Sequence, residues 1–377
     1  MSKRYLLVGD ANSVHIHGFI CAMKKKDPGL IIDVFAVKLL KRKPLCADKV
    51  YEIKLISWYA RFFNKGTRFL SYLPFYFWHK YYLKKYDVIF IHYLTPYYYR
   101  FVKFYKRNTT KLISVFWGSD LFRIKERDIP KVRKIIELSD VINLTTDEMY
   151  KEYCQIFRMT DNKEITNFMF GMSVLDDLIE LEDKIMDRQS FISELSSGID
   201  ITPKTKIVTI GYNGAPEQQH IKIIENLEKK EWEDTLFIFP ITYGGTKKYH
   251  MRLEKALKES SLNWILITKF LSNRQVAKLR YVTDVFIQLQ PTDALSAATQ
   301  EHLFAGNRVI VGSWLPYKTL IDKGVVYHTV NFVDEIVVKL EEVLHSGLLP
   351  SKIKEKNRKA IAEMSAWSEL IEPWMRL

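Results

Sequence analysis

Two acidic residues, Asp293 and Glu301, are separated by seven positions in a segment that follows a short apolar run. Small residues between them mark a loop that turns into a helix; these are Ser296, Ala297, Ala298 and Thr299. The start of such a helix offers free backbone N–H groups and a positive dipole end, which suit a diphosphate. A carboxylate one turn further on can accept hydrogen bonds from both hydroxyls of a ribose. We therefore predict that Glu301 binds a ribose and that Asp293 binds hydroxyls of a sugar. Each acid alone also fits a plainer role, as a helix N-cap or a solvated helical residue.

Two further loops offer donors to a phosphate. Gly211 and Gly214 follow a predicted strand and precede a predicted helix, a layout that brings backbone close to phosphate, and Asn213 lies between them. Glycines are common at strand ends, so this spacing is a weak signal by itself. The next strand ends in a loop with Tyr243, Gly244 and Lys247, whose ammonium group is a candidate phosphate partner.

The N-terminal half contains two candidate loops of its own. Gly118 permits a tight turn after an apolar run, and Asp120 then either faces a binding site or caps a helix. Asn12, Ser13 and His15 follow the first apolar run of the chain and can contact sugar hydroxyls. A helix cap at Ser13 and a packed histidine explain the same residues equally well.

Short apolar segments and longer helical patterns alternate along the whole chain and must position these loops. Ten segments are predicted strands because they are brief, β-branched or aromatic, and apolar on both faces. They are 4–8, 31–37, 88–92, 112–116 and 141–144, then 206–210, 235–239, 264–268, 285–290 and 308–311. Helices are predicted between them, including 221–230, 249–259, 272–281 and 298–305. This order is typical of doubly wound parallel sheets.

The strand–helix series occurs twice, with an acidic and turn-rich join between about 172 and 203. We therefore predict an α/β protein with two Rossmann-like, doubly wound domains that face each other across a ligand-binding cleft. The predicted boundaries are 1–185 for the first domain and 186–350 for the second. The remainder, 351–377, is predicted to be helical and to pack back toward the first domain, with Trp367 and Trp374 on one face.

Positive charge and aromatic residues are concentrated in one stretch. The 377 residues are 47% hydrophobic and carry a net charge of +13, which excludes a disordered chain, a collagen-like repeat and a small disulfide scaffold. Between Trp58 and Arg107, ten Lys or Arg residues accompany one acid, Asp87, and 21 of the 51 aromatic residues. This composition fits a membrane surface, a stacking platform for single-stranded nucleic acid, or a domain core with a basic exterior.

Cysteine usage and hydropathy predict the compartment. Cys21, Cys46 and Cys154 are too few and too scattered for a disulfide framework or a metal cluster, which suits a reducing compartment. The first apolar run is too short for a signal peptide, and no uncharged run is long enough to span a bilayer. We expect a cytoplasmic protein without a metal or bound cofactor, because His15 and His17 lack a ligand spacing and no dinucleotide fingerprint is present.

The segment 293–312 resembles the Glu-seven-Glu motif of retaining GT-B glycosyltransferases, especially family 4, with Asp293 in place of the first Glu. The segment 116–121 resembles the Trp-Gly-x-Asp-Leu motif of bacterial 4-acetamidofucosyl (Fuc4NAc) transferases, which are also GT-B enzymes. The loops at 211–220 and 241–247 are similar to those of the second family. The resemblance implies a GT-B fold without a metal, with Glu301 on the nucleotide ribose and Asp293 near the donor sugar.

The resemblance also implies an activity. It is transfer of a hexose from a nucleotide-sugar to an acceptor, which we expect to be a polyprenyl-diphosphate-linked bacterial surface glycan such as O-antigen, capsule or exopolysaccharide. Residues 186–350 would bind the donor, and 1–185 would bind the acceptor and, through 58–107, the inner face of the plasma membrane. The acid pair favours retention, and the Fuc4NAc-like loops favour inversion. A GT-B sugar-nucleotide epimerase and a non-catalytic basic protein that binds nucleic acid are the alternatives.

Overall fold

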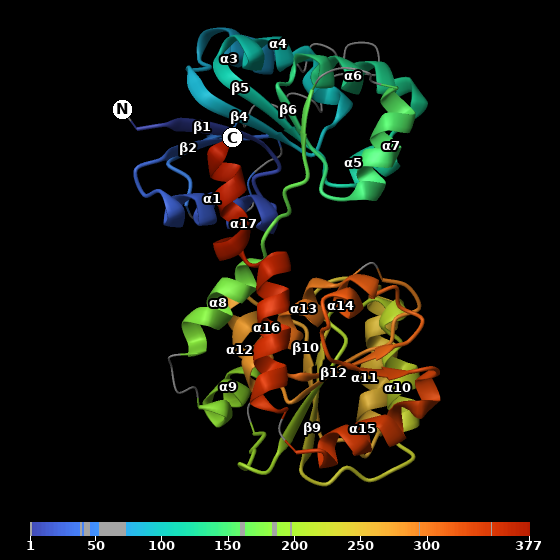
Figure 1. Ribbon diagram of the computed structural model, residues 1–377. Coiled ribbons are helices and arrows are strands. Elements are labelled where there is room, and N and C mark those ends of the chain that lie inside the picture. Colours follow the sequence, from blue (N-terminus) through green and yellow to red (C-terminus); the bar gives the residue numbers. More distant parts are fainter. Residues whose placement is uncertain are drawn as a thin grey trace. The chain divides into compact units, whose positions relative to one another are not determined.

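The computed structural model describes residues 2–37, 40, 46–52, 73–158, 163–182, 187–196, 198–293, 295–347 and 349–377. Their contacts divide the chain into two compact units. Unit 1 consists of Met1–Gly171 and Leu370–Leu377, and unit 2 consists of Met172–Glu369. Each unit has its own parallel sheet covered by helices on both faces, and the two are described separately below (Figure 1).

Unit 1 is built on a seven-stranded parallel sheet in the order β3-β2-β1-β4-β5-β6-β7. The strands are β1 (Arg4–Gly9), β2 (Ile31–Ala36), β3 (Lys49–Glu52), β4 (Tyr86–His92), β5 (Thr109–Val115), β6 (Val141–Asn143) and β7 (Glu164–Thr166). The helices are α1 (Val14–Lys26), α3 (Leu73–Tyr81), α4 (Val102–Arg107), α5 (Ser119–Phe122), α6 (Ile129–Leu138) and α7 (Asp147–Phe157), joined by the C-terminal part of α17 (Trp367–Arg376).

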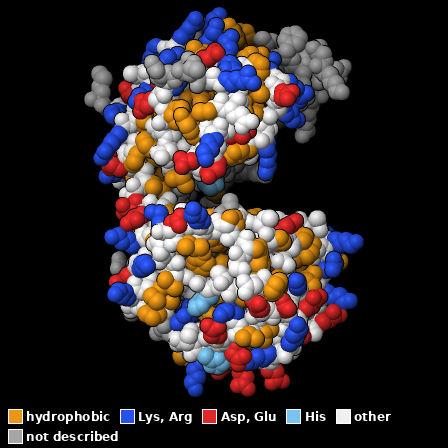
Figure 2. All heavy atoms as spheres, turned by 45° about the vertical axis from the view of Figure 1, so that its right-hand side comes forward, with side chains coloured by type: hydrophobic (Ala, Val, Ile, Leu, Met, Phe, Trp, Pro, Cys, Tyr) orange, Lys and Arg blue, Asp and Glu red, His pale blue; other side chains and the backbone are white. Residues whose placement is uncertain are grey.

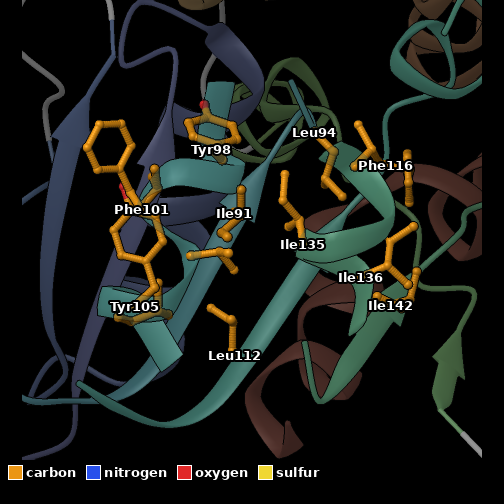
Figure 3. Packing of buried hydrophobic residues seen from close by; sticks show 14 of the residues in the cluster. Ile91, Leu94, Tyr98, Phe101, Tyr105, Leu112, Phe116, Ile135, Ile136 and Ile142 are labelled. Carbon is orange, nitrogen blue, oxygen red and sulfur yellow. The ribbon is translucent and has the colours of Figure 1, made fainter. Parts of the chain in front are cut away.

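Apolar side chains fill both faces of this sheet, as the continuous apolar strands predict. On one face, strand residues such as Ile91 and Leu112 pack with Tyr105 of α4 and Ile135 of α6 (Figure 3). On the other face, Phe19 of α1 packs against Trp374 of α17, with ring centroids 5.0 Å apart, and against Phe90 of β4. Trp374 is fully buried, so the end of the chain completes the core of unit 1.

Unit 2 repeats the same plan with six parallel strands in the order β10-β9-β8-β11-β12-β13. The strands are β8 (Lys206–Ile210), β9 (Thr235–Pro240), β10 (Trp264–Ile267), β11 (Val285–Gln288), β12 (Arg308–Gly312) and β13 (His328–Val330). The helices are α8 (Ser173–Glu182), α9 (Arg188–Leu195), α10 (His220–Leu227), α11 (Lys247–Glu259), α12 (Asn273–Val282), α13 (Ala297–Ala305), α14 (Lys318–Asp322), α15 (Ile336–His345) and α16 (Ser351–Ser365).

Two buried clusters fix the layers of unit 2. Residues of α10, α11 and α15 pack on one face of the sheet. Residues of α8, α12, α13 and α16 pack on the other face, where Phe286 of β11 meets Leu303 of α13 and Ile361 of α16. The helix–sheet layering therefore holds α12 and α13 side by side over the central strands.

The join between the units lies earlier than the sequence predicted. We predicted a boundary at 185/186, whereas the contacts place it after Gly171. The reason is α8, whose Leu175 and Leu178 are buried with Phe286 in the core of unit 2. At the other end, α16 packs with unit 2 and only Leu370–Leu377 pack with unit 1.

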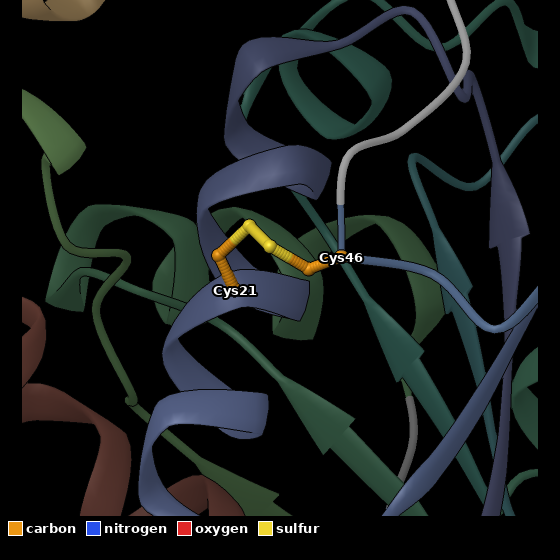
Figure 4. The surroundings of a disulfide bond; sticks show 2 residues. All are labelled: Cys21 and Cys46. Carbon is orange, nitrogen blue, oxygen red and sulfur yellow. A yellow bond between two sulfur atoms is a disulfide. The ribbon is translucent and has the colours of Figure 1, made fainter. Parts of the chain in front are cut away.

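The prediction of three reduced cysteines is wrong for two of them. Cys21 of α1 and Cys46, which precedes β3, form a disulfide with their Cα atoms 5.2 Å apart (Figure 4). That separation is typical of disulfides in proteins. A spacing of 25 residues gave no hint of this contact, because it depends on how the fold brings α1 next to the residues just before β3. Cys154 is free and partly buried.

Candidate functional site

In each sheet, successive strands are added first toward one edge and then toward the other, so two neighbouring strands mark the point where this order reverses. In unit 2 this position lies between β8 and β11, and in unit 1 it lies between β1 and β4. Ligands of doubly wound sheets bind beyond the carboxyl ends of the strands at such a switch point. Three of the loops predicted to be functional follow strands at these points, β8 and β11 in unit 2 and β1 in unit 1, whereas the loop with Tyr243 follows β9 and that with Asp120 follows β5. The fold therefore places the predicted residues where this class of protein binds ligands.

Helix α13 begins where the sequence predicted. Ser296 is its N-cap, and the Ser296 hydroxyl accepts a hydrogen bond from the backbone N–H of Thr299 at 3.1 Å. Ala297 and Ala298 form the first turn, where helical backbone N–H groups lack intrahelical partners. Gln288, at the end of β11, accepts hydrogen bonds from both hydroxyls, at 2.7 Å from Ser296 and 2.6 Å from Thr299. The helix start is thus tied to the end of the central strand.

Asp293 holds the loop that leads into α13. Its Oδ2 accepts hydrogen bonds from the Ser296 backbone N–H at 2.8 Å, from Gln288 Nε2 at 2.9 Å and from the hydroxyl of Tyr317. Tyr317 is buried, and burial together with the Asp293 carboxylate raises the pKa of its phenol. No partner of Asp293 Oδ1 lies among the described residues. Neighbouring Ala294 lies outside the described residues.

Glu301 lies in the second turn of α13, as predicted, but it is not a solvated side chain. Only 6% of the residue is exposed, and its Oε2 forms an ion pair with Nε of Arg280 at 3.1 Å. Arg280 comes from α12 and is 5% exposed. One sequence signal for this partner was overlooked: Arg280 lies three positions after Ala277, so the two share one face of the predicted helix, and both are buried.

The two glycine loops of unit 2 contact each other directly. The backbone N–H of Gly214 donates to the carbonyl of Tyr243 at 2.7 Å. A Cβ on Gly245 would lie 1.9 Å from the Gly214 carbonyl oxygen, so the approach requires glycine. Gly211 has a φ of +66°, and a Cβ there would lie 2.7 Å from His220 Nε2.

Side chains of the two glycine loops also lie near the place where the loops contact each other. Asn213 Oδ1 accepts a hydrogen bond from the Ala215 N–H at 2.8 Å and faces the Cα of Gly244. Lys247 is exposed in the first turn of α11, next to the loop. The residues predicted on both loops therefore come together at one edge of the sheet.

Electrostatic coupling joins these loops to the acid pair. The pKa of Tyr243 is raised chiefly by desolvation of its hydroxyl, then by Tyr212 and the Glu301 carboxylate, while Asn213 and Arg280 act in the opposite direction. The pKa of Tyr212 is raised by burial and by Asp293. Half of the Tyr243 side chain is nevertheless exposed. The predicted donor residues of unit 2 thus lie within electrostatic reach of one another, and the ring of Tyr243 among them is accessible.

In unit 1, Asp120 joins two loops instead of pointing freely outward. Its carboxylate accepts the backbone N–H of Leu94, after β4, at 2.7 Å and that of Trp117, after β5, at 2.9 Å. Asp120 is 8% exposed, and burial raises its pKa to about 6 although backbone hydrogen bonds oppose the shift. A carboxyl group with this pKa can exchange a proton near neutral pH.

The loop after β1 lies beside an aromatic cluster. Asn12 donates its backbone N–H and its amide to Asp10 Oδ1, both at 3.1 Å. Ser13 occupies the N-cap position of α1 without a side-chain cap hydrogen bond. His15, exposed on α1, meets the ring of Trp117 edge-on at 5.2 Å.

One buried histidine of this cluster was missed by the sequence analysis. His92, at the end of β4, is fully buried, and its ring nitrogens have no partner among the described residues. Its ring lies 6.0 Å from that of Trp117. Burial lowers the His92 pKa to about 3, so the ring is neutral. Its position in a strand that reads as continuous core gave no functional signal.

No family model matches the chain, and no curated protein sequence matches it either. Solved structures do match. They include a glycosyltransferase of Rickettsia africae (TM-score 0.65, 12% identity, covering 100% of this chain and 97% of that one). A UDP-forming α,α-trehalose-phosphate synthase of Burkholderia vietnamiensis matches with TM-score 0.61 and 10% identity over 100% and 99% of the two chains. Anabaena HepE, solved with UDP and glucose, matches with TM-score 0.60 and 11% identity over 99% and 98%. The chain therefore has the α/β fold of the GT-B glycosyltransferases.

Proposed function

We propose that the protein is a glycosyltransferase that moves a sugar from a nucleotide-sugar donor to an acceptor hydroxyl. The observation that carries this proposal is the carboxyl edge of the unit 2 sheet. There the loop after β8 is hydrogen-bonded both to the loop after β9 and to Gln290, which precedes the acid pair and the start of α13. Proteins of the same fold support it, since HepE was solved with UDP and glucose and the trehalose-phosphate synthase is UDP-forming.

In this proposal each part of the unit 2 site binds one part of the donor. Glu301 accepts hydrogen bonds from the ribose. The start of α13 and the loop 211–214 bind the diphosphate through backbone N–H groups, assisted by Lys247. Asp293 binds the donor sugar through Oδ1, because Oδ2 is occupied by the loop. Transfer without a metal is part of the proposal, since helix dipoles and backbone donors can stabilise a leaving diphosphate.

The acceptor side of the proposal rests on unit 1. Asp120, Asn12, Ser13 and His15 lie at the carboxyl edge of its sheet beside exposed Tyr93 and the partly exposed ring of Trp117. Aromatic faces and carboxylates together suit carbohydrate hydroxyls and ring C–H groups. We propose a lipid-linked glycan of the bacterial surface as the acceptor. The acid pair of unit 2 favours transfer with retention.

A melting experiment tests the donor half of the proposal. One of UDP, GDP and dTDP is expected to raise the melting temperature, because a ligand that binds only the native state stabilises it by about 2.7 kcal/mol at 100 times its Kd. For a unit of this size that corresponds to a shift of roughly 5 °C or more. Inorganic diphosphate is the control, since a protein of net charge +13 attracts anions without a specific site. A chain that responds to none of the three nucleotides is not a transferase of this kind.

The proposed membrane surface is the exposed side of α3 and the residues after it. Tyr76, Phe77, Tyr81 and Tyr82 are 43–68% exposed, and Lys80, Lys84 and Lys85 lie among them. Figure 2 shows Lys and Arg side chains among apolar ones at the top of the view, where α3 and α4 lie in Figure 1. Other aromatics of the stretch, such as Tyr98, Phe101 and Tyr105, are core. Residues 53–72, including Trp58, lie outside the described residues.

This composition supports peripheral binding to an anionic leaflet. No helix among the described residues has the length and hydropathy needed to cross a bilayer. The proposed location of the protein is the cytoplasmic face of the plasma membrane, where a lipid-linked acceptor would be found.

Replacing Lys80, Lys84 and Lys85 by Gln is expected to weaken binding to vesicles containing phosphatidylglycerol by at least tenfold. Each Lys near an anionic surface contributes about 1 kcal/mol, although Lys85 also donates to the Arg107 carbonyl at 2.5 Å. Vesicle sedimentation at two salt concentrations measures the effect. Replacement of Lys255, Lys258 and Lys318, all exposed in unit 2, is the charge-matched control. Equal sedimentation of both triple variants would remove α3 as the membrane surface.

A further inference from the structure

We propose that Arg280 is the positioning residue that holds the Glu301 carboxylate for the donor ribose, and that this pair makes the site prefer ribonucleotides over 2′-deoxynucleotides. The inference rests on the proposed function, because it assumes that the unit 2 site binds a nucleotide. It adds a residue that lies outside the Asp293–Glu301 segment, and it narrows the class of donor.

The placement of Arg280 is unusual for an arginine. The residue lies on the side of α12 that packs on the sheet and on α13, among the buried Ala277, Leu279 and Val282. The Arg280 and Glu301 side chains are 6% and 9% exposed. Transfer of two charges into such an environment is costly, and apolar residues of similar volume would pack there at no loss of stability. A structural role alone therefore explains the pair poorly.

The hydrogen bonds of the pair are incomplete. Arg280 Nε donates to Glu301 Oε2 at 3.1 Å, but Arg280 Nη1 is enclosed and has no partner among the described residues. No partner of Glu301 Oε1 lies among those residues either. Buried polar groups are usually satisfied, and exceptions often mark a place where a ligand completes the network. Here the enclosed donor is Arg280 Nη1, and it belongs to the residue that pairs with Glu301 of the neighbouring helix.

The hydroxyls of a ribose match the hydrogen-bonding groups of Arg280 and Glu301 that have no partner in the described part of the chain. Each carboxylate oxygen has two lone-pair positions, so Oε2 can accept from Arg280 while the carboxylate still accepts from two vicinal hydroxyls. A fixed guanidinium prevents the carboxylate from rotating, and hydrogen bonds to a charged acceptor are stronger than neutral ones. The pair is near enough to the proposed donor loop for both charges to act on the pKa of Tyr243. A 2′-deoxyribose leaves one acceptor of this arrangement unpaired.

The test compares a ribonucleotide with its 2′-deoxy counterpart. The probes are UDP and 2′-deoxy-UDP, and GDP and 2′-deoxy-GDP, each titrated against wild type and Arg280→Met. We expect wild type to bind one ribonucleotide at least tenfold more tightly than its deoxy form. In Arg280→Met the ratio should fall to near one, and Arg280→Lys should keep an intermediate ratio because it retains the charge but not the planar fork.

A control on the same helix separates this effect from a general loss of charge. Arg274 also lies on α12 and pairs with a glutamate, Glu180 of α8, at 3.6 Å, but both side chains are about half exposed. Arg274→Met should keep the wild-type ratio. If Arg280→Met alone does not fold, Arg280→Lys carries the comparison, because it leaves Glu301 intact, and a ratio below that of wild type is expected for it.

The outcomes distinguish the inference about Arg280 from the proposed function on which it rests. If wild type binds a nucleotide but Arg280→Met, or Arg280→Lys where the Met variant does not fold, keeps the wild-type ratio, the inference is wrong and the proposed function stands. Equal binding of ribo and deoxy forms by wild type also overturns the inference alone. If wild type binds dTDP but neither UDP nor GDP, the inference alone is wrong. If it binds none of the three, the proposed function fails first and the inference fails with it.

Discussion

Replacing Glu301 by alanine is expected to reduce nucleotide affinity by about 100-fold and to lower the free energy of unfolding of unit 2 by about 3–5 kcal/mol. The loss of affinity follows from the proposed contact with the ribose, so KM for the donor should rise more than kcat falls. The loss of stability follows from Arg280, which would be left as an uncompensated charge in a site that is 5% exposed. Urea unfolding and nucleotide titration measure the two effects.

Two variants serve as controls for this prediction. Glu301→Gln keeps the volume and an acceptor for Arg280 Nε, so it should lose less stability than Glu301→Ala while still losing affinity. Glu180→Ala removes the exposed partner of Arg274 and should change stability by less than about 1 kcal/mol. A Glu301→Ala protein with full transfer activity at low donor concentration would show that Glu301 does not bind the donor.

Asp120 is expected to make the stability of unit 1 fall as the pH rises from 4 to 7. Its pKa is raised by burial from 3.8 to about 6 in the folded protein. Between these values the folded state holds more protons than the unfolded state, so raising the pH favours unfolding. A shift of about two pKa units corresponds to roughly 3 kcal/mol in the free energy of unfolding. This contribution is lost as the pH rises across the window, and it is absent above pH 6.

The comparison with Asp120→Asn isolates this effect. Asparagine has no ionisable group, but its amide also fails to accept both backbone hydrogen bonds, from Leu94 and Trp117. The loss of these hydrogen bonds lowers stability equally at every pH. The test is therefore the difference between the slopes of stability against pH in the two proteins. Urea midpoints measured between pH 4 and pH 7 should approach each other as the pH rises. Parallel profiles would mean that Asp120 titrates as an ordinary carboxyl group.

The strands were predictable because most of them are buried on both faces. All ten predicted strands are present, with ends that differ by a few residues. The three that were missed, β3, β7 and β13, are edge strands. Residues in β3 and β7 are half-buried or exposed, so these segments carry neither a continuous apolar run nor a clear alternation. The pairing of an edge strand depends on the sheet beside it, which no local pattern encodes.

The site was predictable only where its residues are close in sequence. The acid pair and the start of α13 occupy one segment, and its small residues predicted the helix start at the correct position. Arg280 and Tyr317 reach the same acids from 21 and 24 positions away, through helix packing and through the loop after β12. The disulfide was missed for the same reason. Tertiary contacts of this kind leave no spacing that distinguishes them from ordinary core or surface residues.

Trp374 gives the two units an order of assembly. The residue completes the core of unit 1 against Phe19 and Phe90, yet it follows the whole of unit 2 in the chain. On the ribosome, the sheet of unit 1 emerges first but remains without its last large aromatic side chain until about 200 further residues have been synthesised. Unit 2 is a continuous segment and can fold in that interval. The core of unit 1 is therefore complete only after the whole of unit 2 has been synthesised.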